Sequence, residues 1–347
     1  MKFLCRLFLC AIISLCSTSL LNAAPDHTGN IPRLIQATPA LVFESYGESG
    51  GSGKTLLEVN PQVLNDLSKN RLNRIVIPAI DREVIFDKTF QKIRSKTSTW
   101  IGRGDEGKSR VVLTIGSDHF FGRVVTADSI IVFEPGQLPS QVISTALDPS
   151  YEVPFVQDEI IAPQSVQEFF ATPEPSDDGT RIDVMVLYTA GMADAYPGSQ
   201  IDTRIQQLID LANLSFTNSN INTQYHLVYS QEVDYPDNTG GNQGSVDDMG
   251  IALDDLTDNN GVFGNIETLR TAYGADQVTL LRRFVDEGCG LAWFLRWGDD
   301  ADLAYALVHD GFKTDGSGYY CSNLTYAHEI GHKLGCAHDP AHSSNPG

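Results

Sequence analysis

The stretch HEIGHKLGCAHD at residues 328–339 constrains the fold of this 347-residue chain more than any other. Residues four apart on an α-helix are separated by about 400° of rotation and roughly 6 Å of rise, so His328 and His332 project from one face. Gly335 can adopt a left-handed conformation that ends the helix and returns the chain toward that face with His338. Three imidazoles gathered in this way fit a tetrahedral zinc site and leave its fourth position to water.

Glu329 directly follows the first of these histidines. From there its carboxylate can take a proton from water that attacks a carbonyl, and can pass that proton to the leaving amine. Zinc would contribute by lowering the pKa of the water and by polarising the carbonyl oxygen. The alternative is a helix with surface histidines and an ordinary glycine stop, which leaves the position of His338 unexplained.

The same stretch resembles the zinc signature of the metzincin metalloendopeptidases. Asp339, after the third histidine, is similar to the adamalysin/reprolysin branch, in which an acidic residue at this place braces the active-site region. Residues 183–229 and 319–339 resemble the bacterial peptidyl-Asp metalloendopeptidase group, and the resemblance as a whole covers residues 181–339. It implies a zinc metalloendopeptidase that cleaves on the amino side of aspartate. Such cleavage calls for a basic pocket, which the sequence does not reveal.

The N-terminus is typical of an export signal. Two basic residues precede an apolar run at residues 7–16, and Asn-Ala-Ala at 22–24 offers small residues for cleavage, so residues 1–24 are predicted to be a signal peptide. Cys16 as a lipoprotein anchor is the alternative. Because no later segment is apolar for about 18 residues, we expect a secreted protein without stable membrane association.

Charge and length limit the partners and the architecture. A chain of this length predicts two folded units. The net charge of −20 argues against nucleic acid as a partner, because phosphate groups would be repelled. Protein or peptide substrates are the expected partners, and the sequence leaves the oligomeric state open.

Residues 25–167 are predicted to form a small, mainly-β unit, which the position before a metzincin-like domain marks as a prodomain. Short β-branched or aromatic runs alternate with turns, and one short helix is predicted near 63–67. No cysteine lies between residues 25 and 288, so this segment cannot keep the protease latent through a cysteine thiolate bound to zinc. Asp118 and His119 are candidates for blocking the metal instead, with a polar hairpin turn as the alternative. The predicted strands lie at 74–80, 84–86, 110–115, 120–125 and 129–133.

Residues 168–180 (EFFATPEPSDDGT) are predicted to be a linker, because they combine proline, acidic residues and glycine with little to bury. A processing cut here would release the domain that follows.

Residues 181–347 are predicted to be the zinc protease domain, with an α+β fold in which long helices pack on a twisted mixed sheet. In the helix at 201–216, Asp202 and Arg204 are assigned to the solvent side. His309 is a possible further ligand, with a structural role as the alternative. The predicted strands lie at 182–188, 225–229, 277–284 and 304–312, and the other helices at 246–256 and 266–273.

Gly290, Leu291 and Ala292 are the predicted substrate-binding residues, since the segment Gly-Leu-Ala-Trp resembles the metzincin edge strand. An unpaired strand edge offers main-chain donors and acceptors to an extended peptide. An ordinary edge strand is the alternative. Residues 234–261 are rich in Asp, Asn and Gly, so calcium is possible, but it is unsupported because no ligand spacing matches a known loop.

The mature chain would keep Cys289, Cys321 and Cys336. In an exported protein we expect Cys289 and Cys321 to form a disulfide that ties the segment before the zinc helix to the start of that helix. Cys336 then is buried in the turn or pairs with a cysteine beyond this sequence. Spacing alone does not decide among pairings of three cysteines.

The end of the chain departs from the metzincin pattern. Metzincins close the floor of the zinc site with a downstream methionine turn, whereas only nine residues follow His338 and every methionine precedes the zinc motif. We therefore expect the protease domain to be truncated, with the methionine-turn region absent, and to bind zinc poorly as it stands.

Together these patterns predict a secreted zinc endopeptidase precursor, that is, a zymogen. Two alternatives stay open. One is a catalytically inactive binding or adhesion protein with a zinc fold, and the other is a zinc hydrolase of small amides.

Overall fold

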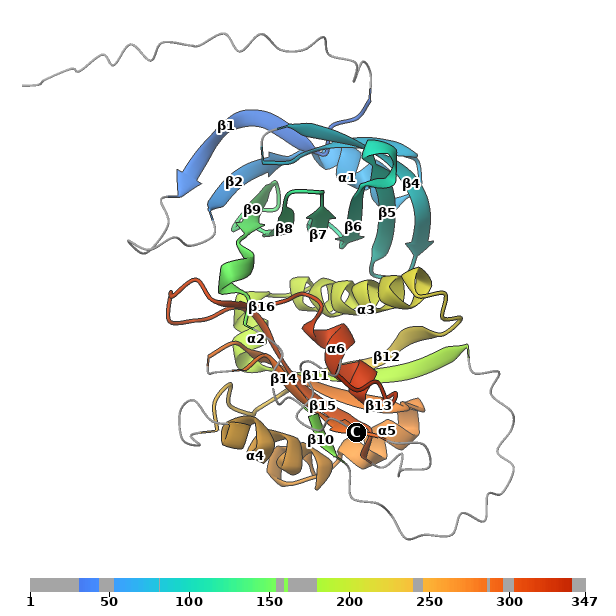
Figure 1. Cartoon of the computed structure of the whole chain (residues 1–347), viewed down its shortest axis with the longest axis vertical. Coiled ribbons are helices and arrows are strands. Elements are labelled where there is room, and N and C mark those ends of the chain that lie inside the picture. The colour runs from blue at the N-terminus through green and yellow to red at the C-terminus, as the bar shows by residue number, and fades with distance from the viewer. Residues whose placement is uncertain are drawn as a thin grey trace, which may run out of the picture.

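The computed structural model describes residues 31–43, 53–80, 82–153, 159–161, 180–239, 246–285, 288–295 and 303–338. The predicted signal peptide, nearly all of the predicted linker, and Asp339 lie outside these residues. Within them, no helix has the length and apolar character needed to cross a membrane. Two sheets organise the chain, one above and one below helix α3 in Figure 1.

The N-terminal unit (residues 31–153) is a nine-stranded antiparallel sheet in the order β1-β2-β9-β8-β7-β6-β5-β4-β3. Leu34 N donates to Val76 O of β3 (3.1 Å) and Val76 N donates to Pro32 O (2.9 Å), so the chain just before β1 closes the sheet toward a barrel. The interior is filled by large apolar side chains such as Trp100 and Phe133. The elements are β1 Ile35–Phe43, β2 Lys54–Val59, α1 Pro61–Ser68, β3 Arg74–Pro78, β4 Glu83–Ile93, β5 Ser98–Gly104, β6 Ser109–Ile115, β7 Phe120–Val125, β8 Ile130–Pro135 and β9 Gln141–Leu147.

The second sheet is mixed, in the order β10-β14-β15-β13-β11-β12, with β16 paired to β15. Strands β12, β11, β13 and β15 run parallel, and β14 is antiparallel to β15. The elements are β10 Glu159–Ile161, β11 Arg181–Thr189, α2 Ala190–Ala195, α3 Gln200–Asn218, β12 Gln224–Val233, α4 Val246–Thr257, α5 Ile266–Tyr273, β13 Gln277–Arg283, β14 Gly290–Phe294, β15 Tyr305–Phe312, β16 Tyr320–Cys321 and α6 Thr325–His332.

Both faces of this sheet are covered by helices. Alternate residues of β11 point to opposite faces: Val184 and Val186 pack with α2, α3 and α6, whereas Met185 and Leu187 pack with α4 and α5. The prediction of a mixed sheet with helices packed against it is confirmed.

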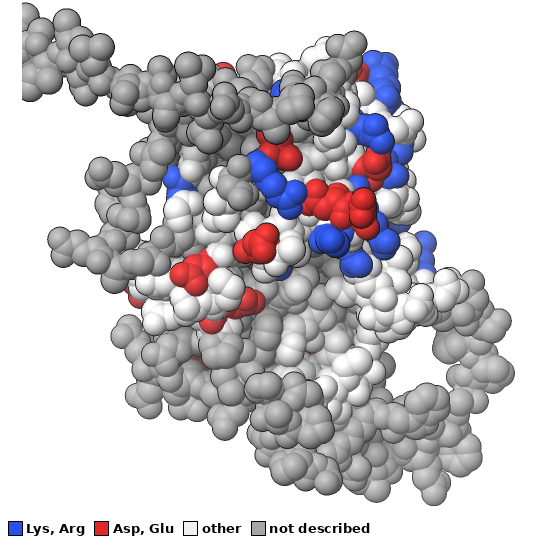
Figure 2. Space-filling view, turned by 45° about the horizontal axis from the view of Figure 1, so that its top comes forward, with Lys and Arg blue, Asp and Glu red and all other residues white. Residues whose placement is uncertain are grey.

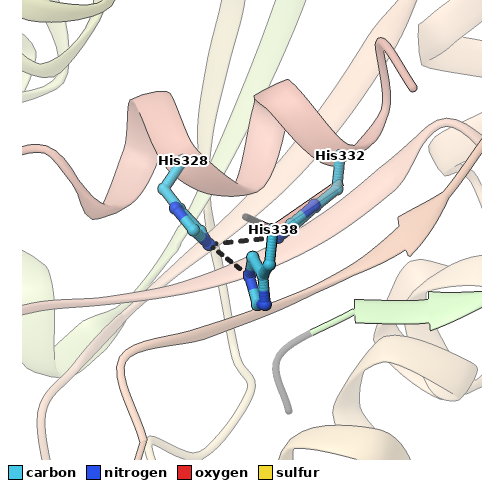
Figure 3. Close-up of side chains that lie close together, drawn as sticks. All are labelled: His328, His332 and His338. Carbon is cyan, nitrogen blue, oxygen red and sulfur yellow. Dashed lines mark hydrogen bonds between the residues drawn. The ribbon is translucent and has the colours of Figure 1, made fainter. Parts of the chain in front are cut away.

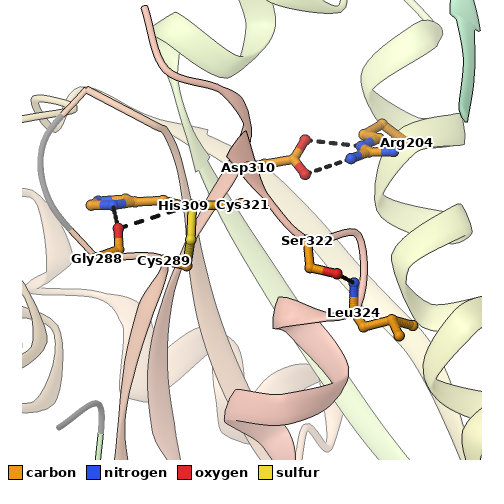
Figure 4. Close-up of a disulfide and its surroundings, with 8 residues drawn as sticks. All are labelled: Arg204, Gly288, Cys289, His309, Asp310, Cys321, Ser322 and Leu324. Atoms are coloured by element: carbon orange, nitrogen blue, oxygen red, sulfur yellow. Dashed lines mark hydrogen bonds and ion pairs between the residues drawn. A yellow bond between two sulfur atoms is a disulfide. The ribbon is translucent and has the colours of Figure 1, made fainter. Parts of the chain in front are cut away.

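Helix α3 lies between the two sheets (Figure 1), and this overturns one prediction. Arg204 is not on the solvent side: it is 1% exposed and makes a bidentate ion pair with Asp310, at 2.9 and 2.5 Å (Figure 4). Asp202 pairs with Lys96 of the N-terminal unit at 2.8 Å. The helical periodicity correctly separates the apolar face from the polar face, but it does not reveal that another part of the chain covers the polar one.

The contact between α3 and the N-terminal unit is largely polar and centres on Asp210. This buried carboxylate accepts hydrogen bonds from Arg94 (2.8 Å), Thr99 and Thr114 (2.8 Å). An apolar anchor lies nearby, since Phe121 of β7 belongs to the core formed by α2, α3 and α6. Such a contact fixes the N-terminal unit without requiring a large apolar surface on α3.

Candidate active site

Three histidines meet beside α6 (Figure 3). Nε2 of His328 lies 3.0 Å from Nε2 of His338 and 3.1 Å from Nε2 of His332. The three form a group whose ligand atoms all lie within 4.8 Å of one another, and it is the only metal-ligand group of this kind among the described residues. A tetrahedral zinc with bonds of about 2.1 Å would separate its nitrogen ligands by roughly 3.4 Å. The nitrogens therefore fit a single zinc ion.

The turn after α6 places the third histidine. Gly335 adopts φ +78°, and its N donates to His332 O at 2.9 Å, which ends the helix and reverses the chain. Nδ1 of His332 lies 2.8 Å from the carbonyl oxygen of Cys336. Because a carbonyl only accepts, Nδ1 carries the proton and Nε2 keeps its lone pair for a metal. Sequence reasoning missed this contact, since a backbone carbonyl leaves no signal in the sequence.

Glu329 is completely buried between the two histidines of α6. Its carboxylate lies against Gly290 of β14, so closely that a Cβ at position 290 would overlap it. The acid expected to move protons therefore lies directly beside the strand expected to hold substrate.

The disulfide prediction is confirmed: Cys289 and Cys321 are bonded, with their Cα atoms 5.3 Å apart (Figure 4). The bond ties the start of β14 to β16, and α6 begins four residues after Cys321. Cys336 is exposed and, among the described residues, is unbonded.

Residues 178–347 match the model of Metallo-peptidase family M12. This segment, just under half of the chain, is an M12 metallopeptidase domain. The family implies zinc as the metal, which the three histidines fit.

Two curated relatives match this chain. The peptidyl-Asp metalloendopeptidase of Pseudomonas aeruginosa (strain PAO1) is 31% identical over 173 residues, which are 45% of this chain and 25% of that protein. The peptidyl-Asp metalloendopeptidase of Xanthomonas campestris pv. campestris is 30% identical over 160 residues, covering 46% of this chain and 34% of that protein. The chain thus spans about a quarter and a third of the two relatives.

A solved structure, metalloproteinase-II from Bacteroides fragilis, is similar over 77% of this chain and 81% of that one. Its sequence identity is 13% and its TM-score is 0.46, values too low to establish a shared fold.

The expectation that β14 is an open edge strand is wrong for most of its length. Strand β10 pairs with it in parallel, with Glu159 opposite Ala292, Ile160 opposite Trp293 and Ile161 opposite Phe294. Gly290, Leu291 and Ala292 are all buried. Sequence reasoning missed the pairing because the two strands lie far apart in the chain.

The segment before β10 is also attached to the M12 domain. Val153 N donates to Tyr320 O of β16 at 3.0 Å, and the Val153 side chain packs against the Cys289–Cys321 disulfide. Residues 152–153 and 159–161, named here the strap, therefore contact both strands that the disulfide joins.

Other predicted candidates lie away from the histidines. His309 is buried, its Nδ1 lies 2.9 Å from Gly288 O, and burial lowers its pKa to about 4. His119 does not block the metal, because its ring nitrogens contact Asp118 (2.9 Å) and Thr203 of α3 (2.8 Å).

Two further details concern the start of α6 and the acidic segment considered for calcium. Leu324 is the N-cap of α6, and Ser322 Oγ accepts a hydrogen bond from Leu324 N at 3.3 Å (Figure 4). Within the described part of residues 234–261, Asp248 is committed to Arg282 and Thr239, so this carboxylate is not available to calcium.

Proposed function

We propose that this chain is the precursor of a secreted zinc endopeptidase. The observation that carries the proposal is the convergence of three histidine Nε2 atoms beside a buried glutamate that faces β14. Membership of the M12 family and the names of the two relatives support the same activity.

In this mechanism His328, His332 and His338 hold the metal, and a bound zinc supplies a Lewis acid and a water of lowered pKa. Glu329 accepts the proton of the attacking water and delivers it to the leaving amine. Its contact with Gly290 holds the carboxylate next to the substrate, whose backbone pairs with the main chain of Gly290, Leu291 and Ala292.

We further propose that the precursor is latent because the strap occupies the substrate edge. Strand β10 pairs with Ala292, Trp293 and Phe294 of β14, so it overlaps the proposed substrate-binding residues at Ala292 and occupies the continuation of the same edge. Glu329 is shielded from solvent in this conformation. This block depends on backbone pairing, which agrees with the lack of a cysteine in the N-terminal unit. Cleavage within residues 168–180 would separate the strap from the M12 domain.

For substrate, we propose peptide bonds on the amino side of aspartate. The support is the name shared by the two relatives. Digestion of a peptide mixture, followed by mass spectrometry of the new N-termini, tests it: an excess of N-terminal aspartate is expected, and a random distribution would exclude it.

Casein hydrolysis by the secreted protein tests the activity itself. Hydrolysis is expected to stop with a chelator, return with zinc, and be absent in Glu329→Gln. If the wild type does not hydrolyse casein and Glu329→Gln keeps the biological effect of the wild type, the chain is better described as a binding protein. Cleavage of small amides but not casein would favour an amidohydrolase.

A further inference from the structure

A cavity of about 250 Å³ lies between the N-terminal unit and α3, outside the active site. One wall is the outer face of β4, β5 and β6, and the other is formed by the C-terminal half of α3 and the start of β12. Both units therefore contribute to it.

The cavity is lined by four cationic side chains, those of Lys92, Arg94, Arg103 and Arg110, but by only one acidic one, that of Asp210. Asp210 is already engaged by Arg94 and by two threonines. Among the described residues, the side chains of Lys92, Arg103 and Arg110 have no hydrogen-bond or ion-pair partner. The cavity thus carries uncompensated positive charge in a chain of net charge −20.

The sheet register places two of these positive charges next to each other. Arg103 of β5 lies directly opposite Arg110 of β6, and like charges in directly opposed positions destabilise a sheet. On its other side Arg103 lies opposite Asp87 of β4, but that carboxylate is paired with Arg74 at 2.5 Å. Burial lowers the pKa of Lys92, and the nearby charges of Arg94 and Arg181 lower it further, against an opposing effect of Asp210. A counter-charge between these side chains would relieve the repulsion.

Away from the cavity, the arginines at the surface of the N-terminal unit are paired, whereas Arg123 is buried. Arg71 contacts Asp66 at 3.3 Å and Arg82 contacts Asp105 at 2.8 Å. On the face in Figure 2, basic and acidic side chains accordingly lie side by side over this unit. Unpaired arginines are therefore not a general property of this surface.

We propose that this cavity binds a small anion with a phosphate or carboxylate group. Arginine guanidinium groups match both anions in bidentate geometry. Asn218 on the opposite wall offers a further donor, and Phe90 and Leu214 can enclose a short apolar part of an organic anion. Because the ligating side chains come from both units, the bound anion stabilises the docked form of the N-terminal unit.

Calorimetric titration of the full chain with sodium phosphate or sodium succinate, at constant ionic strength set with sodium chloride, tests this. We expect saturable binding of at least one of the two, which identifies the anion class. Affinity should fall at least tenfold in the double variant Arg103→Gln/Arg110→Gln and be unchanged in the control Arg71→Gln/Arg82→Gln, which removes two paired arginines from the same unit.

Lys92→Gln gives a second, independent test if the double variant does not fold, and it should also weaken binding. No binding of either anion to the wild type would overturn the proposal. Wild-type affinity in the double variant, or in Lys92→Gln where the double variant does not fold, would overturn it as well. Casein hydrolysis is not required for any of these outcomes, so the result is separable from that of the proposed protease function.

Discussion

The carboxylate of Glu329 lies against the backbone of Gly290, in space that only a residue without a Cβ leaves open. This contact joins the helix that carries the histidines to the strand proposed to bind substrate. The position of the acid therefore depends on a glycine in another element.

Gly290→Ala tests this dependence. The added methyl group should displace the carboxylate and reduce kcat by roughly 10- to 100-fold, because a misplaced catalytic group loses rate steeply. Zinc content should stay unchanged, since the three atoms nearest to the added Cβ all belong to Glu329 and none to a histidine. If zinc content and activity fall equally, Gly290 is needed for the fold as a whole rather than for the position of the Glu329 carboxylate. Hydrolysis rate and bound zinc are measured on the same preparation.

Gly335→Ala should weaken zinc binding. A non-glycine residue at φ +78° costs about 1–2 kcal/mol, and the new Cβ would lie 3.0 Å from the carbonyl oxygen of Leu295. The turn would shift and carry His338 away from the other two ligands. Gly331→Ala is the matched control, because its Cβ would have no contact closer than 3.8 Å and alanine favours a helix. Competitive zinc titration measures both variants, and equal affinities would exclude this role for Gly335.

The metal site was predictable from sequence because its geometry is local. The spacing of His328 and His332 fixes their common face, and the glycine before His338 indicates the reversal that brings the third imidazole to them. The disulfide was predictable because exported chains pair their cysteines and few were available. These arguments need no knowledge of the rest of the fold.

What sequence reasoning missed depends on packing between distant segments. Arg204 lies on a polar helical face, and periodicity cannot reveal that Asp310 and the N-terminal unit cover it. The partner of β14 could not be predicted because β10 is short and precedes the linker. The Cys336 carbonyl that orients His332 is a backbone atom, so no residue type indicates it.

Because of His309, the free energy of unfolding should decrease as the pH falls from about 6.5 to about 4. Burial lowers the folded-state pKa of this histidine to about 4, so in that range only the unfolded chain binds the proton. The loss amounts to about 3 kcal/mol across the full interval. His309→Asn removes the titration, while its amide can still donate to Gly288 O. Thermal unfolding of both proteins at pH 7 and pH 5 is the measurement, and an equal decrease in Tm would contradict the assignment.

The strap predicts that latency can be relieved without proteolysis. Proline at position 160 fixes φ and lacks an N–H, so Ile160→Pro should disrupt the pairing of β10 with β14 and open the substrate edge. The uncleaved variant should hydrolyse casein at least tenfold faster than the uncleaved wild type, and Ile160→Ala, which keeps the backbone donor, should not. Adding Glu329→Gln to the proline variant should abolish the gain, which excludes a contaminating protease. If Ile160→Pro stays as inactive as the wild type while cleavage within residues 168–180 activates both, the block lies elsewhere in the N-terminal unit.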